Sequence, residues 1–415
     1  MTASCNKLKL VVFDVEGVLI PRNRFFFLIG KSLGFIQLIK VFFYGFLYEA
    51  GLIPLKTALK HLFNDVRGMN IERILQIGAR VPIVPGAETL FNNLKAQGCK
   101  TALITSGLPT IVTQLIADRL GADYAFGFEV GLNGDVLTGQ IWGDVIERNG
   151  KLAVLRKLFR DESVAINSCA VVADDRNNAS IFLQDIFKIG FNPDFVLRIK
   201  ADRIVMGSIT KLLPIINREP KPLGIKPSRN DLIRETIHAS GFFVTIIAHF
   251  VGLIFIVVPT ILILALYVIS EYLRTIGKKM PIINYVTRKA ASKNELYQIV
   301  LAPVYYAVGI LLALLIFPVP ANYATVAIFT LGDSMASLVG EYYGATSLPF
   351  NRAKSLEGSL AGFVFAFLAG AVFISPWFAL VGAAIAMFIE YLPLPINDNL
   401  LIPVFTGLIL TLLVR

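Results

Sequence analysis

Long apolar segments fill the second half of the sequence, and they limit the folds open to the chain more than any other feature. Of its 415 residues 55% are hydrophobic, and the mean hydropathy is +0.67. Soluble domains contain roughly half apolar residues even when glycine is counted among them. A length of 415 residues also suits two domains better than one. We therefore expect a membrane protein whose second half is an all-α bundle of transmembrane helices.

The apolar segments predict about seven transmembrane helices, because each segment is close to the length that crosses the hydrocarbon core of a bilayer. The first two are separated only by Pro259, which predicts a tight hairpin at that proline. The seven segments lie near residues 239–256, 258–275, 297–316, 323–343, 356–374, 376–392 and 400–414.

Basic residues predict the orientation of these helices in the cell membrane, because lysine and arginine concentrate in cytoplasmic loops. With the N-terminal domain in the cytoplasm, an odd number of spans leaves Arg415 outside the cell. The outward loops FPVPAN and ISP contain neither lysine nor arginine. Membrane topology thereby explains the net charge of +10, and we expect no nucleic acid partner. The basic residues of the cytoplasmic side are Lys221, Lys226, Arg229, Arg234, Lys278, Lys279, Arg288, Lys289, Lys293, Arg352 and Lys354.

The N-terminal half has the pattern of a cytoplasmic α/β domain. Its start, MTASCNKLKLVVFD, lacks the pattern of a cleaved signal peptide. Cys5, Cys99 and Cys169 are far apart, which favours reduced thiols over a disulfide framework. Short apolar runs such as KLKLVVFD, KTALITS and AVVADD alternate with helix-like stretches, which is typical of strands and crossover helices around a parallel sheet. The predicted boundaries are an α/β domain over residues 1–215, a proline-rich linker over 216–230 and a transmembrane domain over 231–415.

Polar side chains stand where the predicted strands end. Asp14 follows the first strand, Glu16 comes two residues later, and Ser106 follows the strand ALIT. Lys151 follows the turn ERNG, and Asp174 follows the strand VVA. Because the carboxyl ends of parallel strands lie along one edge of a sheet, these side chains can converge on one small volume. The acidic stretch VVADDRNNAS leaves two interpretations open, a metal site or a helix N-cap formed by its aspartates.

These motifs, in this order, resemble the haloacid dehalogenase superfamily of phosphohydrolases, and within it the phosphoserine-phosphatase-like branch. The likeness extends over about residues 8–215 and includes VPIVPGAETLFNNLKAQG and GDVLTGQIWG. It implies an α/β Rossmann-like domain with a helical cap at about residues 22–82. It also implies a magnesium-dependent phosphomonoesterase that acts through an aspartyl-phosphate. By this resemblance Asp14 is the nucleophile, Glu16 is the general acid and base, Ser106 and Lys151 bind phosphate, and Asp14, Asp174, Asp175 and Asn178 surround Mg²⁺.

Two residues depart from the pattern of this superfamily. Glu16 stands where the superfamily usually has aspartate, and its longer side chain keeps the acid. Asn178 fills the second acidic position of the last motif, and an amide can ligate a cation but carries no charge. We therefore expect weaker metal binding unless Asp175 substitutes for the missing carboxylate.

The start of the cap region, RNRFFFLIGKSLGFIQLIKVFFYGFLYEAGLIPL, is unusually apolar. Lys31, Gln37 and Lys40 interrupt it, so it makes a poor membrane-spanning helix. One interpretation is ordinary packing of the cap. The other is an interfacial helix that inserts phenylalanine and leucine side chains into the membrane surface and brings the phosphatase to a lipid phosphate.

Polar residues also gather on the cytoplasmic side of the predicted transmembrane domain. Charged groups at membrane depth are costly and usually line a site. Asp333 is the clearest example, because it falls about halfway along the fourth predicted span. The motifs are IRETIHASG, ISEYLR with Glu271, LGDSMASLVGEYYG, AKSLEGSLAG and LPINDN.

These motifs resemble those of the CTP-dependent polyprenol kinases, the group of dolichol and phytol kinases that is related to phosphatidate cytidylyltransferases. The likeness covers about residues 228–415 and depends most on GDSMASLVG followed by KSLEGSLAG. It implies a kinase with CTP as phosphoryl donor, Mg²⁺ as cofactor and a long-chain isoprenoid alcohol as its membrane substrate. The sequence has no GxxxxGK[ST] loop for phosphate binding. The residues expected to act are Gly332, Lys354, Ser355 and Gly358 on the nucleotide, and Asp333 with Glu357 or Asp398 on Mg²⁺. The general base is His238 or an acidic neighbour.

Several of these residues also have simpler interpretations. In these interpretations Gly358 and Gly362 form a GxxxG pattern that only packs helices. Lys354 only marks the cytoplasmic side of the membrane, and His238 only lies at the level of the lipid headgroups. Two other functions stay open: a cytidylyltransferase that acts on a lipid phosphate, and a transporter or scaffold with an inactive phosphatase-like head. The sequence predicts a bifunctional phosphatase and polyprenol kinase. It does not specify the alcohol, the phosphatase substrate or the oligomeric state.

Overall fold

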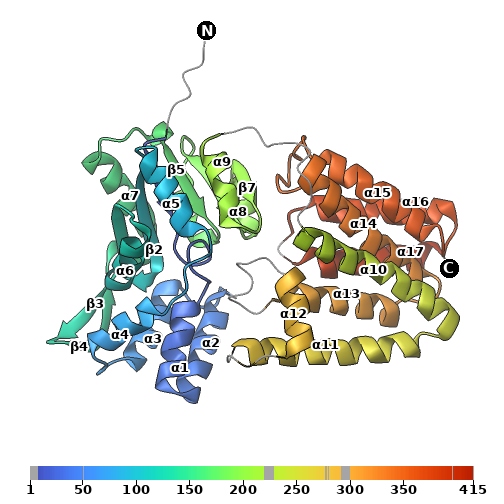
Figure 1. Ribbon diagram of the computed structural model, residues 1–415, viewed down its shortest axis with the longest axis horizontal. Coiled ribbons are helices and arrows are strands. Elements are labelled where there is room, and N and C mark those ends of the chain that lie inside the picture. The colour runs from blue at the N-terminus through green and yellow to red at the C-terminus, as the bar shows by residue number, and fades with distance from the viewer. Residues whose placement is uncertain are drawn as a thin grey trace, which may run out of the picture. The chain divides into compact units, whose positions relative to one another are not determined.

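The chain forms two compact units, Met1–Pro220 and Lys221–Arg415 (Figure 1). The computed structural model describes residues 8–49, 51–218, 229–275, 278, 280–290, 300–394 and 396–414. Most of the linker predicted over 216–230 lies outside these ranges. These ranges also leave out Cys5, Lys221, Lys226, Lys279, Lys293 and Arg415. The four lysines were among the basic residues from which the membrane orientation was predicted.

A seven-stranded sheet forms the centre of the first unit, in the order β4-β3-β2-β1-β5-β6-β7. Neighbouring strands are parallel except β3 and β4, which pair as an antiparallel hairpin. The predicted α/β fold of this half is therefore confirmed. The strands are β1 (Leu10–Phe13), β2 (Lys100–Pro109), β3 (Tyr124–Asn133), β4 (Val136–Trp142), β5 (Cys169–Ala173), β6 (Phe187–Phe191) and β7 (Arg203–Val205).

The central strands β1 and β5 are buried along their whole length. Parallel strands that are covered on both faces are continuous apolar runs, and LVVF and CAVVA have this composition. Leu10 is in register with Lys100 of β2 and with Cys169 of β5, so the carboxyl ends of the three strands align. Around the sheet lie α5 (Ala87–Ala96), α6 (Thr110–Leu120), α7 (Gly150–Asp161), α8 (Phe195–Lys200) and α9 (Leu212–Ile216), with short 3₁₀ turns at Asp144–Ile146, Ile166–Ser168, Arg176–Asn178 and Ile209–Lys211.

Four helices lie within the residues for which a cap was predicted. The apolar run at its start forms two helices, because the chain turns at Gly34, whose φ of +125° is a conformation open mainly to glycine. The cap packs on the sheet through aromatic contacts, such as the edge-to-face pair of Phe63 and Phe128 at 5.1 Å. The cap helices are α1 (Arg24–Leu33), α2 (Phe35–Glu49), α3 (Leu55–Asp65) and α4 (Ile71–Ala79).

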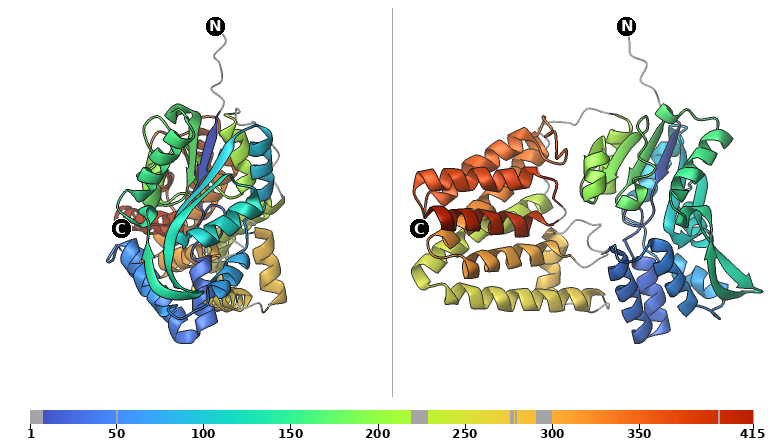
Figure 2. Two further views of the ribbon diagram at one scale, coloured as in Figure 1. Left: turned by 90° about the vertical axis from the view of Figure 1, so that its left-hand side faces the viewer. Right: turned by 180° about the vertical axis from the view of Figure 1, so that it is seen from behind.

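The described residues of the second unit form helices and the loops that join them, and most of these helices lie side by side in a bundle, whereas α12 runs across them (Figures 1 and 2). The helix α14 is the most buried of them and packs against α10, α13, α15, α16 and α17. The helices are α10 (Arg229–Val251), α11 (Ile254–Thr275), α12 (Pro281–Ala290), α13 (Ala302–Ile316), α14 (Ala321–Tyr343), α15 (Leu356–Gly370), α16 (Pro376–Tyr391) and α17 (Asp398–Leu413).

Among the described residues, two helices are long and apolar enough to cross a membrane, Ile254–Arg274 and Ala321–Tyr343. They differ in burial, since 17% of the apolar window is buried in the first and 67% in the second. The first therefore exposes most of an apolar surface. Four further apolar helices of the second unit, α13, α15, α16 and α17, are shorter than 18 residues. The count of seven spans stays a prediction.

The turn between the first two apolar helices was predicted at Pro259, and that position is wrong. Pro259 lies inside α11, and the turn falls at Gly252, which has a φ of +104°. Glycine tolerates this backbone conformation, whereas a side chain would strain it. Pro259 is the sixth residue of the helix, so α11 continues through it without the hydrogen bond that an N–H at this position would donate to Phe255 O.

Candidate active sites

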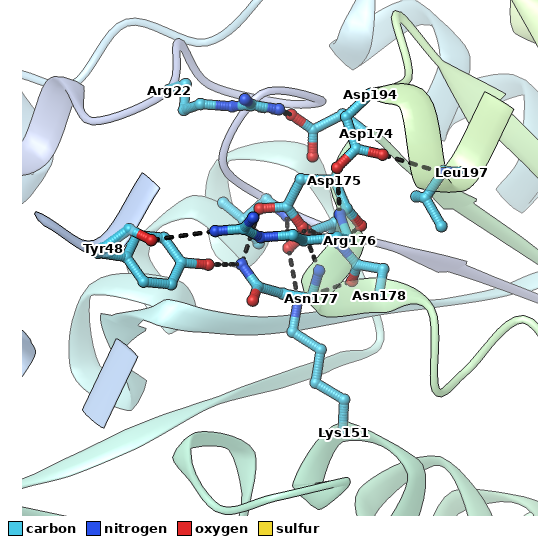
Figure 3. Close-up of polar contacts among 12 residues, drawn as sticks. Arg22, Tyr48, Lys151, Asp174, Asp175, Arg176, Asn177, Asn178, Asp194 and Leu197 are labelled. Carbon is cyan, nitrogen blue, oxygen red and sulfur yellow. Dashed lines mark hydrogen bonds and ion pairs between the residues drawn. The ribbon is translucent and has the colours of Figure 1, made fainter. Parts of the chain in front are cut away.

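The polar residues predicted at the strand ends lie around the carboxyl ends of β1, β2 and β5. Asp14 follows β1 and is 5% exposed, and Asp174 follows β5. Lys151 enters from the first turn of α7 and is buried. Figure 3 shows Lys151 reaching up to the loop that carries Asp174, Asp175 and Asn178.

Lys151 and Asn178 hold the Asp14 carboxylate from two sides. The Lys151 ammonium lies 3.1 Å from Asp14 Oδ1 and donates to Asn178 Oδ1 at 2.7 Å. The Asn178 amide donates to Asp14 Oδ2, and also to Asp175 Oδ1 at 2.9 Å. The backbone N–H of Val15 donates to Asp14 Oδ1 at 2.8 Å. The carboxylate is therefore fixed in direction, as a nucleophile needs to be.

Asp14, Asp174 and Asp175 could hold a divalent metal ion. Each offers one oxygen, these oxygens lie within 4.8 Å of one another, and no other group of three such ligands occurs among the described residues. Asp174 Oδ1 is buried without a hydrogen-bond partner in the part of the chain that the structure describes. Its other oxygen pairs with Arg22. Three carboxylates, one of which has an unsatisfied buried oxygen, fit the chemistry of Mg²⁺.

The acidic stretch serves as an N-cap through Asp175, and metal binding by its aspartates stays a prediction. Asp175 caps the short turn Arg176–Asn178 by accepting from Asn177 N at 3.1 Å, and it also belongs to the carboxylate group. Asn178 contacts the same carboxylates: its amide nitrogen donates to Asp14 and Asp175, and its oxygen accepts from Lys151. Metal binding by Asn178 stays a prediction.

A glycine makes room for the Asp174 carboxylate. Gly17 has a φ of +81°, and a Cβ built on it would overlap Asp174 Oδ2. A second glycine, Gly107 at the end of β2, gives the same room to the Glu16 carboxylate. Beside it, Ser106 is buried and donates to Val145 O at 2.7 Å. The carboxyl end of β2 therefore brings Ser106 next to the residue predicted as general acid.

Burial perturbs the acidic groups of this site. It raises the pKa of Glu16 to about 8, and the charges of Asp14 and Asp175 act in the same direction. It also raises the pKa of Asp14, although Lys151 opposes the shift. The pKa of Asp174 lies well above its ordinary value for the same reason. At neutral pH Glu16 therefore keeps a proton that it can donate.

Several residues of this site were not predicted from the sequence. Tyr48, near the end of the cap helix α2, contacts the Asn177 side chain, and its carbonyl accepts from Arg176 Nη2 at 3.0 Å (Figure 3). Asp194 accepts from the backbone N–H groups of Arg176 at 2.7 Å and Leu197 at 2.9 Å. Asp194 could have been predicted as an N-cap, because it directly precedes an apolar helix. No local pattern predicts the contact of Tyr48 with Asn177, because the two residues are 129 positions apart in the sequence.

In the second unit, Asp333 and His238 come together. His238 of α10 has Nδ1 3.5 Å from Asp333 Oδ2 on α14, and its ring stacks on Tyr306 at 4.3 Å. The Tyr306 hydroxyl donates to His238 O at 2.5 Å. A carboxylate beside one ring nitrogen of a histidine fixes its tautomer and leaves the other nitrogen for a substrate.

Lys354 has a buried acidic partner that was not predicted. It forms an ion pair with Glu390 of α16, whose backbone carbonyl accepts from Asn351 Nδ2 at 3.3 Å. Asp333 and Asp398 also interact electrostatically with Lys354. Glu235 of α10 interacts in the same way with His238 and Asp333. Glu390 and Glu235 are carboxylates within or beside apolar runs, and that signal would have predicted both.

The remaining residues predicted for the kinase site have structural contacts. Ser355 caps α15 by accepting from Gly358 N at 3.2 Å. Gly332 and Gly358 lie where α14 and α15 pack closely, since a Cβ on Gly358 would lie 2.6 Å from Ala336 O and one on Gly332 2.9 Å from Ala366 Cβ. Glu357 accepts from Thr346 N at 3.1 Å. Nucleotide binding by the two glycines and metal binding by Glu357 stay predictions.

Comparison with known proteins assigns the two halves separately. Residues 11–177 match the family profile of haloacid dehalogenase-like hydrolases. A phosphoserine phosphatase of Archaeoglobus fulgidus is 31% identical over 161 residues, which cover 39% of this chain and 45% of the relative. Another, of Methanocaldococcus jannaschii, is 28% identical over 198 residues, which cover 47% of this chain and 91% of the relative.

The second half has relatives of another kind. A probable chloroplastic phytol kinase 2 of Glycine max is 29% identical over 140 residues, which cover 29% of this chain and 48% of the relative. The chain therefore spans about half the length of this relative and of the first phosphatase. The first half of the chain is therefore similar to haloacid dehalogenase-like hydrolases, and among them to phosphoserine phosphatases, and it is joined to a helical half that is similar to phytol kinases.

Proposed function

We propose that the chain is a bifunctional membrane enzyme that both forms and hydrolyses phosphate monoesters. In this proposal the second unit phosphorylates a long-chain isoprenoid alcohol with CTP, and the first unit hydrolyses a phosphate monoester with Mg²⁺. The observation that carries the phosphatase part is the buried Lys151 ammonium 3.1 Å from Asp14 Oδ1, beside two further carboxylates. A fixed carboxylate next to a lysine is what transfer of a phosphoryl group to an aspartate requires.

The phosphatase reaction needs two balanced steps. The Asp14 carboxylate attacks phosphorus, the bond from phosphorus to the ester oxygen breaks, and Glu16 donates its proton to the departing alkoxide. Water then attacks the acyl phosphate, gives its proton to Glu16, and releases inorganic phosphate and the Asp14 carboxylate. Lys151 and Ser106 bind the oxygens of the transferring group. Mg²⁺ held by Asp14, Asp174 and Asp175 would neutralise its charge.

The kinase reaction has one transfer step. The alcohol oxygen attacks the γ-phosphorus of CTP, the bond to the β-phosphate oxygen breaks, and CDP leaves. His238 accepts the hydroxyl proton at Nε2, since Asp333 lies 3.5 Å from its Nδ1. Lys354 binds phosphate oxygens, and Glu390 orients its ammonium. Transfer of this kind depends chiefly on positioning and charge neutralisation.

The membrane location is supported by apolar surface on the second unit. Helix α11 leaves most of its apolar window unburied, and Phe250 and Trp377 are among the most exposed side chains of this unit. Water does not stabilise contiguous apolar surface of this extent, whereas lipid does. The proposed orientation keeps the first unit in the cytoplasm and the C-terminus outside.

The phosphatase proposal is tested with the full chain in detergent. The protein should release phosphate from para-nitrophenyl phosphate in the presence of Mg²⁺, and Asp14→Asn should abolish the reaction. Folded protein without turnover on any soluble or lipid monoester would favour an inactive head and contradict the proposal.

The kinase proposal is tested with the Asp14→Asn protein, so that the attached phosphatase does not remove the product. CTP labelled at the γ-phosphate should give a labelled lipid with dolichol-like or geranylgeraniol-like alcohols, and α-label should stay with CDP. Asp333→Asn and Lys354→Ala should each lower the rate by about 10²–10³-fold. Transfer of α-label to a lipid phosphate would establish a cytidylyltransferase. No transfer of either label would contradict the enzyme function of this unit.

A further inference from the structure

Helix α2 of the cap is apolar on its exposed face as well as on its packed face. One side packs against the core through Val41. On the opposite side phenylalanine and isoleucine recur every three or four residues, which aligns them along one helix face. Phe35, Phe42 and Phe46 are 77%, 61% and 67% exposed. The whole set is Phe35, Ile36, Ile39, Phe42, Phe43 and Phe46, called the α2 face below.

The cap also carries the positive charge of the first unit. Residues 22–82 contain nine basic and three acidic residues, whereas the rest of the unit contains seventeen of each. Lys31 is exposed just before α2, and Lys40 borders the α2 face, where its ammonium lies 2.8 Å from Asp65 Oδ1. Apolar aromatic side chains bordered by basic ones match the boundary between acyl chains and anionic headgroups of a bilayer.

The charge argues against two protein partners for this face. A second copy would bring two strongly positive caps together, and like charges repel at an interface. The second unit is also positive, with thirteen basic and nine acidic residues over 221–415. An anionic lipid surface has the opposite sign, so it complements the cap where these proteins do not.

The far end of α2 reaches the phosphatase site. Tyr48, two residues after Phe46, contacts the Asn177 side chain, and its carbonyl accepts from Arg176 Nη2 at 3.0 Å. Arg176 and Asn177 directly follow the carboxylates Asp174 and Asp175. One helix therefore carries both an apolar face and a contact to the acidic loop.

A short segment tethers the first unit to the second. Residues 219–228 separate the last described residue of the first unit from α10. An extended chain of that length reaches at most about 40 Å. If the second unit spans the membrane as proposed, this tether keeps the first unit within reach of the bilayer at high effective concentration, so a weak apolar contact is enough to dock it.

We propose that the α2 face docks on the surface of an anionic bilayer, and that the phosphatase site takes phosphate monoesters of membrane lipids from that surface. This inference rests on the proposed phosphatase and names its substrate class. A lipid phosphate keeps its tail in the bilayer while its phosphate reaches Asp14, so docking lowers the KM for lipid substrates and leaves soluble substrates unaffected.

The kinetic test uses full-length protein in nanodiscs made of equal parts phosphatidylcholine and phosphatidylglycerol. The double variant Phe42→Ser, Phe46→Ser should raise the KM for a polyprenyl monophosphate by about tenfold, because two apolar side chains no longer enter the bilayer. Its kcat/KM for para-nitrophenyl phosphate should not change. The matched control is Leu132→Ser, which removes an exposed apolar side chain from the β3–β4 hairpin and should affect neither substrate.

Two kinetic results would overturn the inference. Equal losses on both substrates would show that the two phenylalanines support the fold of the cap, and no loss on either would show that the face does not dock. If the parent protein hydrolyses neither substrate, the proposed phosphatase fails, and docking is then decided by the following measurement alone.

Membrane depth is measured with a spin label, which needs no activity. With the three native cysteines replaced, Phe43→Cys carries the label on the α2 face and Leu132→Cys carries it on the hairpin. In nanodiscs holding one protein each, the label at 43 should be relaxed by oxygen more than by a water-soluble nickel chelate, and the label at 132 the reverse. Nickel accessibility at 43 equal to that at 132 would refute docking. Shielding of position 43 from both reagents would assign the face to a protein contact instead.

Discussion

Replacing Asn178 by aspartate tests how the phosphatase site balances its charges. The Asn178 side chain is fully buried, and each of its polar atoms has a partner. Its amide donates to Asp14 Oδ2 and to Asp175 Oδ1 at 2.9 Å, and its oxygen accepts from Lys151 at 2.7 Å. Asn178→Asp removes both donors and brings a third negative group against two carboxylates.

The magnitude follows from these contacts. Each hydrogen bond to a charged acceptor contributes about 1.5–3 kcal/mol, so the loss of two gives about 3–6 kcal/mol. Lys151 pairs with the new carboxylate and offsets part of the loss, so we expect the lower end, about 3 kcal/mol. For a domain of this size that lowers the Tm by about 6–12 °C. Mg²⁺ should reduce the difference in Tm between the variant and the parent protein, because a cation binds more tightly to a site with an added negative charge.

The assay can follow the first unit alone within the full chain. The sequence has two tryptophans, Trp142 in β4 and Trp377 in α16, one in each unit. In a Trp377→Phe background, thermal unfolding of the first unit is followed by the fluorescence of Trp142, in EDTA and in Mg²⁺. Asn177→Asp is the matched control; its amide donates to one carboxylate oxygen, Asp175 Oδ2 at 2.8 Å, so it should lower the Tm less.

Two results would refute this reasoning. An unchanged Tm of Asn178→Asp in EDTA would mean that the two donated hydrogen bonds are not needed by the carboxylates. A Tm difference between variant and parent protein that is the same in EDTA and in Mg²⁺ would mean that the cluster of carboxylates near Asn178 does not bind the ion.

The other predictions concern pH, metal binding and the second unit. In EDTA the free energy of unfolding of the first unit should fall as pH rises from 4.5 to about 8, because the folded state keeps the proton of Glu16 that the unfolded state has lost; unfolding midpoints across that range measure it. Gly17→Ala should weaken Mg²⁺ binding measured by calorimetry and lower the phosphatase rate, because its Cβ would overlap Asp174 Oδ2; unchanged binding would contradict that packing. Glu390→Gln should lower the kinase rate by about 10²-fold by freeing Lys354, while the phosphatase rate of the same preparation stays constant; equal losses in both would indicate unfolding.

The sequence by itself predicted an α/β first half and a helical second half, and the structure has both. Apolar runs ending in Asp14 and Asp174 predicted parallel strands with a site at their carboxyl ends, and β1 and β5 have those bounds. This works because a strand buried on both faces must be apolar along its length, and polar residues appear only where it ends. The apolar helices of the second unit were predicted for the same reason, since burial or lipid contact demands apolar side chains all round.

Only the tertiary structure decided which polar groups meet. Asn178 was predicted as a metal ligand, and only the structure showed which groups it contacts: its amide nitrogen donates to Asp14 and Asp175, and its oxygen accepts from Lys151. Glu390 was missed although it pairs with Lys354 across 36 residues. Such pairings depend on how helices and strands far apart in sequence pack, and no local pattern records that. Local composition specifies burial and element type, whereas the partner of a buried charge is selected by the geometry of the whole fold.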